Sequence, residues 1–313
     1  MSYVIKRLLS MTFTLILISI ITFVITNILP GDVAIMIMGT QSNPEALANL
    51  RENLGLNDTL FVQYGNWVLG ILQGDLGTSL LFKMPIGPLL LQKITSSALI
   101  VALSMSVALL LAIPLGVWAA VHKNRWQDNF SSSVSIIGVS LPDFFWGIML
   151  ILIFARALGW FPSSGFVHPN EDIFLAIKHA FLPSLALGLG LMAHLTRMTR
   201  ATMTGILSQE FIRVARAKGL KEKVVVWQYG LSSAIGPVIT VAGLQTGYLF
   251  GSIIVMESLF NYTGMGWLTY QALLNRDIPL IQATVFSIAA AVMLINLLID
   301  LLYPILDPRV RLS

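Results

Sequence analysis

The sequence predicts an all-α integral membrane protein with six transmembrane helices. Hydrophobic residues make up 56% of its 313 residues, charged residues only 11%, and the mean hydropathy is +0.81. A soluble domain carries about 25% charged residues. A hydrocarbon core about 30 Å thick needs roughly 20 apolar residues of helix. Six stretches approach or exceed that length with almost no charge, so the fold class follows from composition and run length together.

The six predicted spans follow one another along the chain. They are residues 8–29, 98–121, 130–154, 180–195, 234–256 and 280–306. The fourth is the shortest and contains Pro183. No cysteine is present, which excludes disulfides, thiolate metal sites and a cysteine nucleophile.

The long segment between the first two spans should form a small ordered cap outside the membrane. Residues 44–53 and 61–72 have the apolar spacing of short helices. We therefore expect two parts: residues 1–97, with the first helix and the external cap, and residues 98–313, a five-helix core. The core should carry a polar loop at about residues 197–230 that faces the cytoplasm.

The distribution of basic residues predicts the orientation. With the N-terminus inside, 13 of the 19 lysines and arginines face the cytoplasm, where such residues are held during insertion. Both termini are then cytoplasmic. The net charge of +4 is too small to indicate a nucleic-acid partner and fits membrane orientation.

The polar segment 208–219 is predicted to be one short cytoplasmic helix. Ser208 is a plausible N-cap, and Glu210 complements the positive end of the helix dipole. Arg216 complements the negative end, and Gly219 can adopt the left-handed conformation that ends a helix.

This predicted helix has two different faces. Phe211, Val214 and Ala215 form an apolar face, and basic residues such as Arg213 occupy the other. Such a helix could lie on the bilayer surface. Its small residues and compact caps favour a protein partner instead.

Residues 214–220, within this predicted helix and its end, resemble a motif of a known protein family. The stretch Val214-Ala215-Arg216-Ala217-Lys218-Gly219-Leu220 is similar to the cytoplasmic "EAA" loop of binding-protein-dependent ABC importer permeases, in the dipeptide, oligopeptide and nickel branch. Further motifs across nearly the whole chain fit the same branch. They are Leu29-Pro30-Gly31-Asp32, Gly74-Asp75-Leu76-Gly77, Leu141-Pro142, residues 257–266 (ESLFNYTGMG), Arg276-Asp277-Ile278-Pro279 and Asp307-Pro308-Arg309.

The resemblance implies a type I importer (MetI-like) permease fold in the bacterial inner membrane. It implies that residues 208–219 form a coupling helix, with Glu210, Phe211, Arg213, Ala215, Arg216 and Gly219 as the residues that contact or shape the ATPase site. Arg213 stands where the general family motif has glutamate. The expected partners are a sister permease forming a heterodimer, two cytoplasmic ATP-binding subunits, an extracytoplasmic solute-binding protein and membrane lipid.

By the same resemblance, the chain is a non-catalytic subunit that forms half of the pathway for di- or oligopeptides. It has no Gly-x4-Gly-Lys-Ser/Thr phosphate loop, so we expect no cofactor and expect ATP hydrolysis to occur in the partner. Nickel, a metal chelate or glutathione are alternative substrates within the branch.

Several polar residues inside or at the ends of the spans are candidates for function. Asp143, beside Pro142, is either a pathway or hinge position or a carboxylate that pairs with a neighbouring helix. Glu257 is either part of an outer gate or a solvated helix-end carboxylate. His194, Arg197 and Arg200 are interpreted as topological anchors.

Other residues are interpreted as helix-packing positions. Gly243, Gly247 and Gly251 recur every fourth residue, a spacing that either lets helices approach closely or forms a smooth face along which two subunits slide. Asn296 and Asp300 lie four residues apart and should form an interhelical hydrogen-bonding pair.

Two other classes of function remain open. A stand-alone secondary transporter or channel would be expected to show conspicuous intramembrane charges and repeated halves, and the sequence has few such charges and no detectable repeat. An intramembrane enzyme is disfavoured because no His-Glu-x2-His or Gly-x-Ser-x-Gly motif occurs.

Overall fold

The computed structural model describes residues 2–28, 33–38, 43–53 and 55–306. Within these ranges the chain is helical, without strands apart from one isolated bridge between Thr78 and Pro85, which confirms the all-α prediction. Five helices in the described part are long and apolar enough to cross a membrane, or six if one bent pair is a single span. The chain divides into two compact units, unit 1 (Met1–Ser96 and Thr263–Met293) and unit 2 (Ser97–Tyr262 and Leu294–Ser313).

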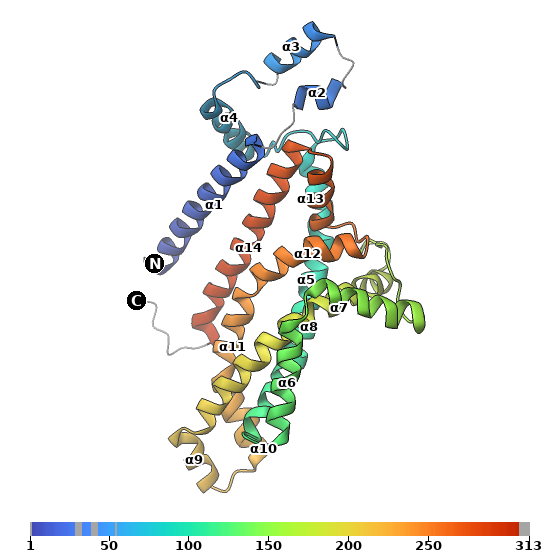
Figure 1. Cartoon of the computed structure of the whole chain (residues 1–313). Helices are drawn as coiled ribbons and strands as arrows, with labels where there is room; N and C mark the ends of the chain where they lie inside the picture. The colour runs from blue at the N-terminus through green and yellow to red at the C-terminus, as the bar shows by residue number, and fades with distance from the viewer. Residues whose placement is uncertain (1, 29–32, 39–42, 54, 307–313) are drawn as a thin grey trace. The chain divides into compact units, whose positions relative to one another are not determined.

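Unit 1 contains the first helix, the short helices that follow it, and parts of two long helices. Its elements are α1 (Ser2–Ile28), α2 (Val33–Met38), α3 (Pro44–Asn53), α4 (Leu60–Gln73), the start of α5 (Ile86–Val121), α13 (Met265–Leu274) and the first part of α14 (Ile278–Leu306) (Figure 1). The two short helices predicted at 44–53 and 61–72 are α3 and α4, so the apolar spacing placed both correctly. α4 ends at Gly74, whose φ of 81° is left-handed.

A buried aspartate organises the core of unit 1. Apolar residues of α5, α13 and α14, among them Ile86, Leu268 and Leu280, form a cluster. Asp277 is fully buried beside it and accepts hydrogen bonds from Ser79 Oγ (2.6 Å) and from the Leu81 backbone N–H (3.0 Å). Its other oxygen accepts from the Leu280 N–H at the start of α14. One carboxylate therefore caps α14 and holds the turn that follows α4.

Unit 2 contains the remaining helices. They are the rest of α5, α6 (Trp126–Ser140), α7 (Asp143–Leu150), the π-helix η1 (Ile151–Ala157), α8 (Ile173–Leu207), α9 (Glu210–Ala217), α10 (Glu222–Val224), the π-helix η2 (Val225–Leu231), α11 (Ser232–Leu244), α12 (Thr246–Leu259) and the end of α14. α8 is the central helix of this unit, with α6, α7, α11 and α12 all packed against it (Figure 1).

The predicted third span, 130–154, is wrong as a single straight helix. α6 ends at Ser140, and the next helices run on after a bend of 99°. The break lies at Leu141-Pro142, where Leu141 is extended (φ −98°, ψ 131°). A proline disfavours the helical conformation of the residue before it and has no N–H to donate, so the chain turns here.

The fourth predicted span is too short, because α8 runs without interruption for 35 residues through Pro183. Its start is fixed by Asp172, whose side chain accepts a hydrogen bond from the Leu175 N–H. The predicted span ends at residue 195, just before the basic residue Arg197, whereas the helix continues to Leu207.

The fifth predicted span, 234–256, is also wrong as one helix. The apolar helix long enough to span runs over Glu222–Leu244, and Thr246–Leu259 is a separate shorter apolar helix. The break lies at Gln245, between α11 and α12. Residues 222–230, which the sequence analysis assigned to the cytoplasmic loop, are therefore part of the helical segment that leads into α11.

Candidate functional site

The short helix predicted at 208–219 is present as α9, although its start differs from the prediction. α9 covers Glu210–Ala217, and Gln209 rather than Ser208 occupies the N-cap position. The Ser208 hydroxyl instead donates to the Gly205 carbonyl at the end of α8. Gly219 has a φ of 77°, as expected of a left-handed residue that ends a helix.

One face of α9 is anchored to the helices of unit 2. Ile212 is fully buried and Ala215 is 5% exposed. They pack into an apolar cluster with residues of four further elements, α5, α8, η2 and α11. The other buried members are Val117, Ala120, Met203, Ile206, Val225, Val226 and Ala234. Because α9 touches the ends of several long helices through one core, a displacement of α9 would move those ends with it.

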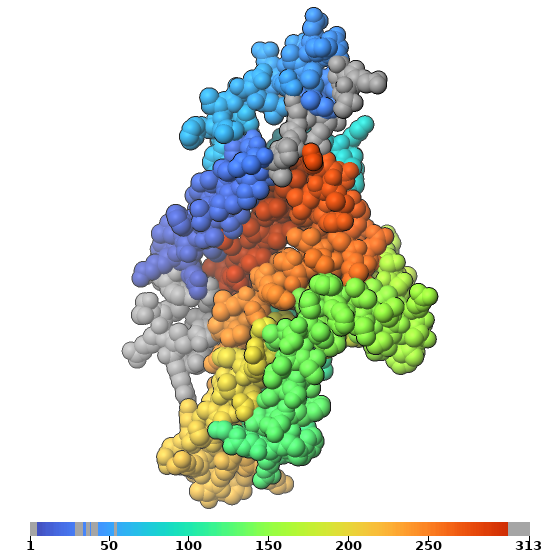
Figure 2. Space-filling view, in the orientation of Figure 1, coloured from blue at the N-terminus to red at the C-terminus, as the bar shows by residue number. Residues whose placement is uncertain are grey.

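The opposite face of α9 is apolar and open. Phe211 is 37% exposed and Val214 47% exposed, and Arg213 and Glu210 lie beside them in the open. The predicted grouping of Phe211, Val214 and Ala215 on one face is therefore wrong, because Ala215 belongs with Ile212 on the inner side. In Figure 2 the surface of α9 lies at one end of unit 2. Two exposed apolar side chains on a short, firmly held helix form a surface suited to a protein partner.

An ion pair closes the loop that follows α9. Arg216 donates two hydrogen bonds to the Glu222 carboxylate, at 2.7 and 3.1 Å. The hydrogen bond with Glu222 raises the pKa of Arg216 above its ordinary value. With the left-handed Gly219 between them, this pair fixes the chain as it returns from α9 to α10.

A second ion pair, missed in the sequence analysis, ties α6 to α8 near the same core. Arg200 binds both oxygens of Asp128, with its Nη2 2.7 Å from Oδ2. Asp128 is 3% exposed, and it also accepts from the backbone N–H of Asn124, a left-handed residue in the turn between α5 and α6. Arg200, which the sequence predicted to be a topological anchor, is thus a structural clamp between α6 and α8.

Asp143 lies at the start of α7 and is bound by a neighbouring helix. Its Oδ2 accepts a hydrogen bond of 2.8 Å from the Tyr248 hydroxyl of α12. Its Oδ1 stands over Gly190 of α8, where a Cβ atom would be 2.5 Å away. The structure therefore joins three elements of unit 2 at this carboxylate.

Glu257 is fully buried, which contradicts the alternative of a solvated helix-end carboxylate. Its Oε1 accepts a hydrogen bond of 2.5 Å from Ser97 Oγ, so it links α12 to α5 within unit 2. Nearby, Tyr262 is also fully buried and packs edge-on against Phe166. Burial and coupling to Glu257 raise the pKa of Tyr262.

The glycines of α11 and α12 differ in their surroundings. A Cβ on Gly243 would lie 2.6 Å from Ile299 of α14, so this glycine allows close helix contact in unit 2. A Cβ on Gly251 would meet nothing within 4 Å. The side chain of Asp300 lies outside the described residues, as do Leu29-Pro30-Gly31-Asp32 and Asp307-Pro308-Arg309, so the Asn296–Asp300 pair stays a prediction.

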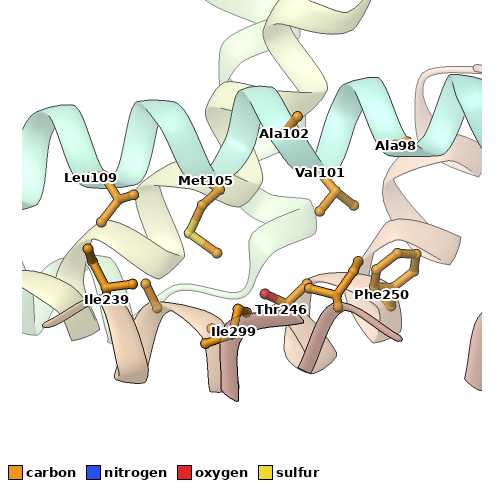
Figure 3. A pocket seen from close by; sticks show the side chains of 12 residues that line it. Ala98, Val101, Ala102, Met105, Leu109, Ile239, Thr246, Phe250 and Ile299 are labelled. Atoms are coloured by element: carbon orange, nitrogen blue, oxygen red, sulfur yellow. The ribbon is translucent and has the colours of Figure 1, made fainter. Parts of the chain in front are cut away.

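A cavity of about 380 Å³ lies between α5, α11, α12 and α14 in unit 2 (Figure 3). Its lining side chains are apolar except for Thr246, and Met105, Leu109 and Phe250 project into it. A peptide would lose the hydration of its charged groups there without compensation, so this cavity does not suit a charged substrate.

Comparison with known proteins assigns the class of this chain. Residues 112–312 match the family model "Binding-protein-dependent transport system inner membrane component", and residues 1–81 match the N-terminal model of the same type of component. The chain belongs to this family of ABC importer permeases, which confirms the resemblance seen in its motifs.

Its relatives place it more narrowly in the dipeptide and oligopeptide branch. It is 37% identical to the glutathione transport system permease protein GsiC of Salmonella typhimurium over 99% of both chains. It is also 37% identical to the dipeptide transport system permease protein DppB of Alkalihalophilus pseudofirmus, again over 99% of both. Among solved structures, an inward-facing MetNI methionine ABC transporter gives a TM-score of 0.59 at 17% identity, covering 70% of this chain and 96% of that one. This likeness confirms the MetI-like fold.

Proposed function

We propose that this chain forms half of a translocation pathway for di- or oligopeptides and that two separate ATPase subunits drive it through α9. The observation that carries the proposal is the two-sided character of α9. Ile212 and Ala215 are locked into the core of unit 2, while Phe211 and Val214 remain exposed. A partner that grips the outer face would transmit its movement through the inner one.

The other half of the pathway would come from a sister permease, and an extracytoplasmic solute-binding protein would deliver the substrate. The exposed Leu244 and Val255 on α11 and α12 support a further subunit against unit 2. Both termini would be cytoplasmic, and ATP hydrolysis would take place in the partner. Labelling of introduced cysteines from outside intact cells tests this orientation: labelling at Val214 would contradict it.

The names of the relatives narrow the substrate to those of the dipeptide and oligopeptide branch but do not select one compound. A glutathione permease and a dipeptide permease are equally identical to this chain, at 37%. Both molecules are small, charged and peptide-like, and a di- or oligopeptide is the proposed substrate. Calorimetric titration of the cognate solute-binding protein with dipeptides, tripeptides, glutathione and Ni²⁺ tests it. Tight binding of Ni²⁺ alone would exclude the peptide assignment.

The docking role of α9 is tested with Phe211→Asp and Val214→Asp. Either change places a charge in an apolar contact, so each should reduce co-purification of the ATPase at least tenfold, since about 1.4 kcal/mol of lost binding free energy suffices for that factor. The protein itself should fold, because both side chains are exposed. The matched control is Phe61→Asp on α4, an equally apolar side chain that is 91% exposed. Full ATPase recovery with both α9 variants would refute the docking role.

A further inference from the structure

Asp143 lies in a small polar cluster to which three helices contribute. α7 contributes Asp143, α12 contributes the Tyr248 hydroxyl that donates to it, and α8 contributes a glycine beneath it. Any side chain at position 190 would collide with Asp143 Oδ1, because even a Cβ would stand 2.5 Å from that oxygen. The local sequence thus makes room for a carboxylate and orients it.

This carboxylate is accessible from outside unit 2. Tyr248 is 47% exposed and Asp143 is half-buried. In the part of the chain that the structure describes, no lysine or arginine forms an ion pair with Asp143. A charged group inside the membrane is costly unless it is paired or wet. An accessible carboxylate without a cationic partner therefore fits a water-filled passage better than a lipid-facing surface.

A basic residue lies farther along the same side of α8. Residues 190, 194 and 197 are spaced by four and three, which places them on one face of the helix. Asp143 stands over the first of these positions. Arg197 is exposed, and its Nη2 lies 3.4 Å from His194 Nδ1. Within the described ranges it forms no ion pair with an acidic residue.

Asp143 and Arg197 therefore present opposite charges along one face. Seven residues of α-helix rise about 10 Å, which is the spacing along α8 between the site of the carboxylate and Arg197. An extended peptide spans at most about 3.3–3.6 Å per residue. The two ends of a zwitterionic tripeptide are separated by about the same length as the two charges.

We propose that Asp143 and Arg197 form a contact site for the two charged ends of a zwitterionic peptide as it crosses the membrane. Asp143 receives the N-terminal ammonium group and Arg197 the C-terminal carboxylate, with Tyr248 as a positioning residue for Asp143. The proposal rests on the proposed function and adds to it a site inside the permease that favours short peptides with both ends free. Because both charges are solvent-accessible, each contact is weak enough to release the peptide onward.

The test uses the complete transporter in proteoliposomes, with sister permease, ATPases and solute-binding protein, and measures initial uptake of labelled trialanine below saturation. Asp143→Asn and Arg197→Gln should each lower uptake about tenfold, the effect of losing one charge-assisted hydrogen bond. ATP hydrolysis stimulated by the loaded binding protein should persist. Asp143→Glu and Arg197→Lys, which keep the charges, should recover most of the uptake. Uptake equal to wild type in both charge-removing variants would overturn the inference.

A second comparison separates a charge contact from a purely structural link between α7 and α12. Asp143→Asn keeps an oxygen that can accept from Tyr248 and removes the charge, whereas Tyr248→Phe removes the hydrogen bond and keeps the charge. The contact site requires the greater loss of uptake in Asp143→Asn. A greater loss in Tyr248→Phe would show that the cluster is a structural link instead. The wild-type transporter provides the control for the substrate. If it fails to take up trialanine while another ligand still stimulates ATP hydrolysis, that result contradicts the proposed peptide substrate. The charge-removing variants test the contact site itself.

Discussion

At the scale of residues, a few polar and small side chains hold the long helices of unit 2 together. Arg200 and Asp128 join α8 to α6 through two hydrogen bonds, and Asp128 also caps the turn before α6. Glycines make the other close contacts possible. A Cβ on Gly116 of α5 would lie 2.5 Å from Thr199 Cβ and 2.9 Å from the Thr196 carbonyl of α8. These contacts explain how apolar helices pack in register.

Removing the charge of Asp128 should destabilise unit 2. Asp128→Asn leaves the Arg200 guanidinium without its anionic partner in a partly buried place, at a cost of about 1–3 kcal/mol. Thermal unfolding of the purified protein in detergent should show the loss as a lower melting temperature. In the double variant with Arg200→Gln the two losses should not add, because they remove the same interaction. Additive losses would show that the pair is not coupled.

Enlarging Gly116 should cost stability even by one methyl group. Gly116→Ala forces α5 and α8 apart against backbone as well as side-chain atoms, and such overpacking costs about 1–3 kcal/mol. Gly205→Ala on α8 is the matched control, since a Cβ there meets nothing within 4 Å. The control should be neutral or slightly stabilising, as alanine favours helix. Equal melting temperatures for the two variants would contradict the close contact.

At the scale of elements, α9 is the helix whose two faces have different surroundings, one buried and one exposed. Its inner face depends on Ile212 and Ala215, and its end depends on the left-handed Gly219 and on the Arg216–Glu222 pair. Replacing Ala215 by aspartate would place a carboxylate in the apolar cluster and disturb the core, whereas changes at the outer face leave the core intact. The position of a substitution on α9 should therefore decide whether it affects folding or the proposed docking.

Gly219 offers a test of the turn after α9. A φ of 77° is unfavourable for a β-branched residue, while asparagine tolerates it, and a Cβ at this position would meet nothing within 4 Å. Gly219→Val should therefore misplace α9 and reduce ATPase co-purification and uptake. Gly219→Asn should retain most of both, because the backbone conformation and not the space is the constraint. Equal behaviour of the two variants would argue against this role of the turn.

The sequence predicted the positions and ends of short helices better than the bends of long helices or the contacts between them. The apolar spacing located α3 and α4, and Gly219 marked the end of α9, because both signals are local. The spans at 130–154 and 234–256 were wrong because apolar runs do not show where a helix bends. The inner face of α9 was misassigned because four apolar residues, Phe211, Ile212, Val214 and Ala215, allow more than one face on so short a helix. The Asp128–Arg200 pair joins residues 72 positions apart, and no local pattern reports such a contact.

At the scale of the whole molecule, the chain is a permease of an ABC importer, with a fold that its motifs had already indicated. What the motifs could not show is that α9 shares one apolar core with α5, α8, η2 and α11, so that force applied to a short exposed helix reaches several long ones. The same unit carries the Asp143 cluster on α7, α8 and α12. The proposed docking surface and the proposed substrate contact therefore both lie in unit 2.

The most direct test of this account is cross-linking from α9 in the assembled transporter. The chain has no cysteine, so Val214→Cys provides a single attachment point for a photoreactive thiol reagent. Illumination should join this chain to the ATPase subunit, while Phe61→Cys on α4, at a position more exposed than Val214, should give no such product. The opposite result, with no ATPase adduct from position 214 in a complex that still transports, would contradict the claim that α9 couples the permease to its ATPase.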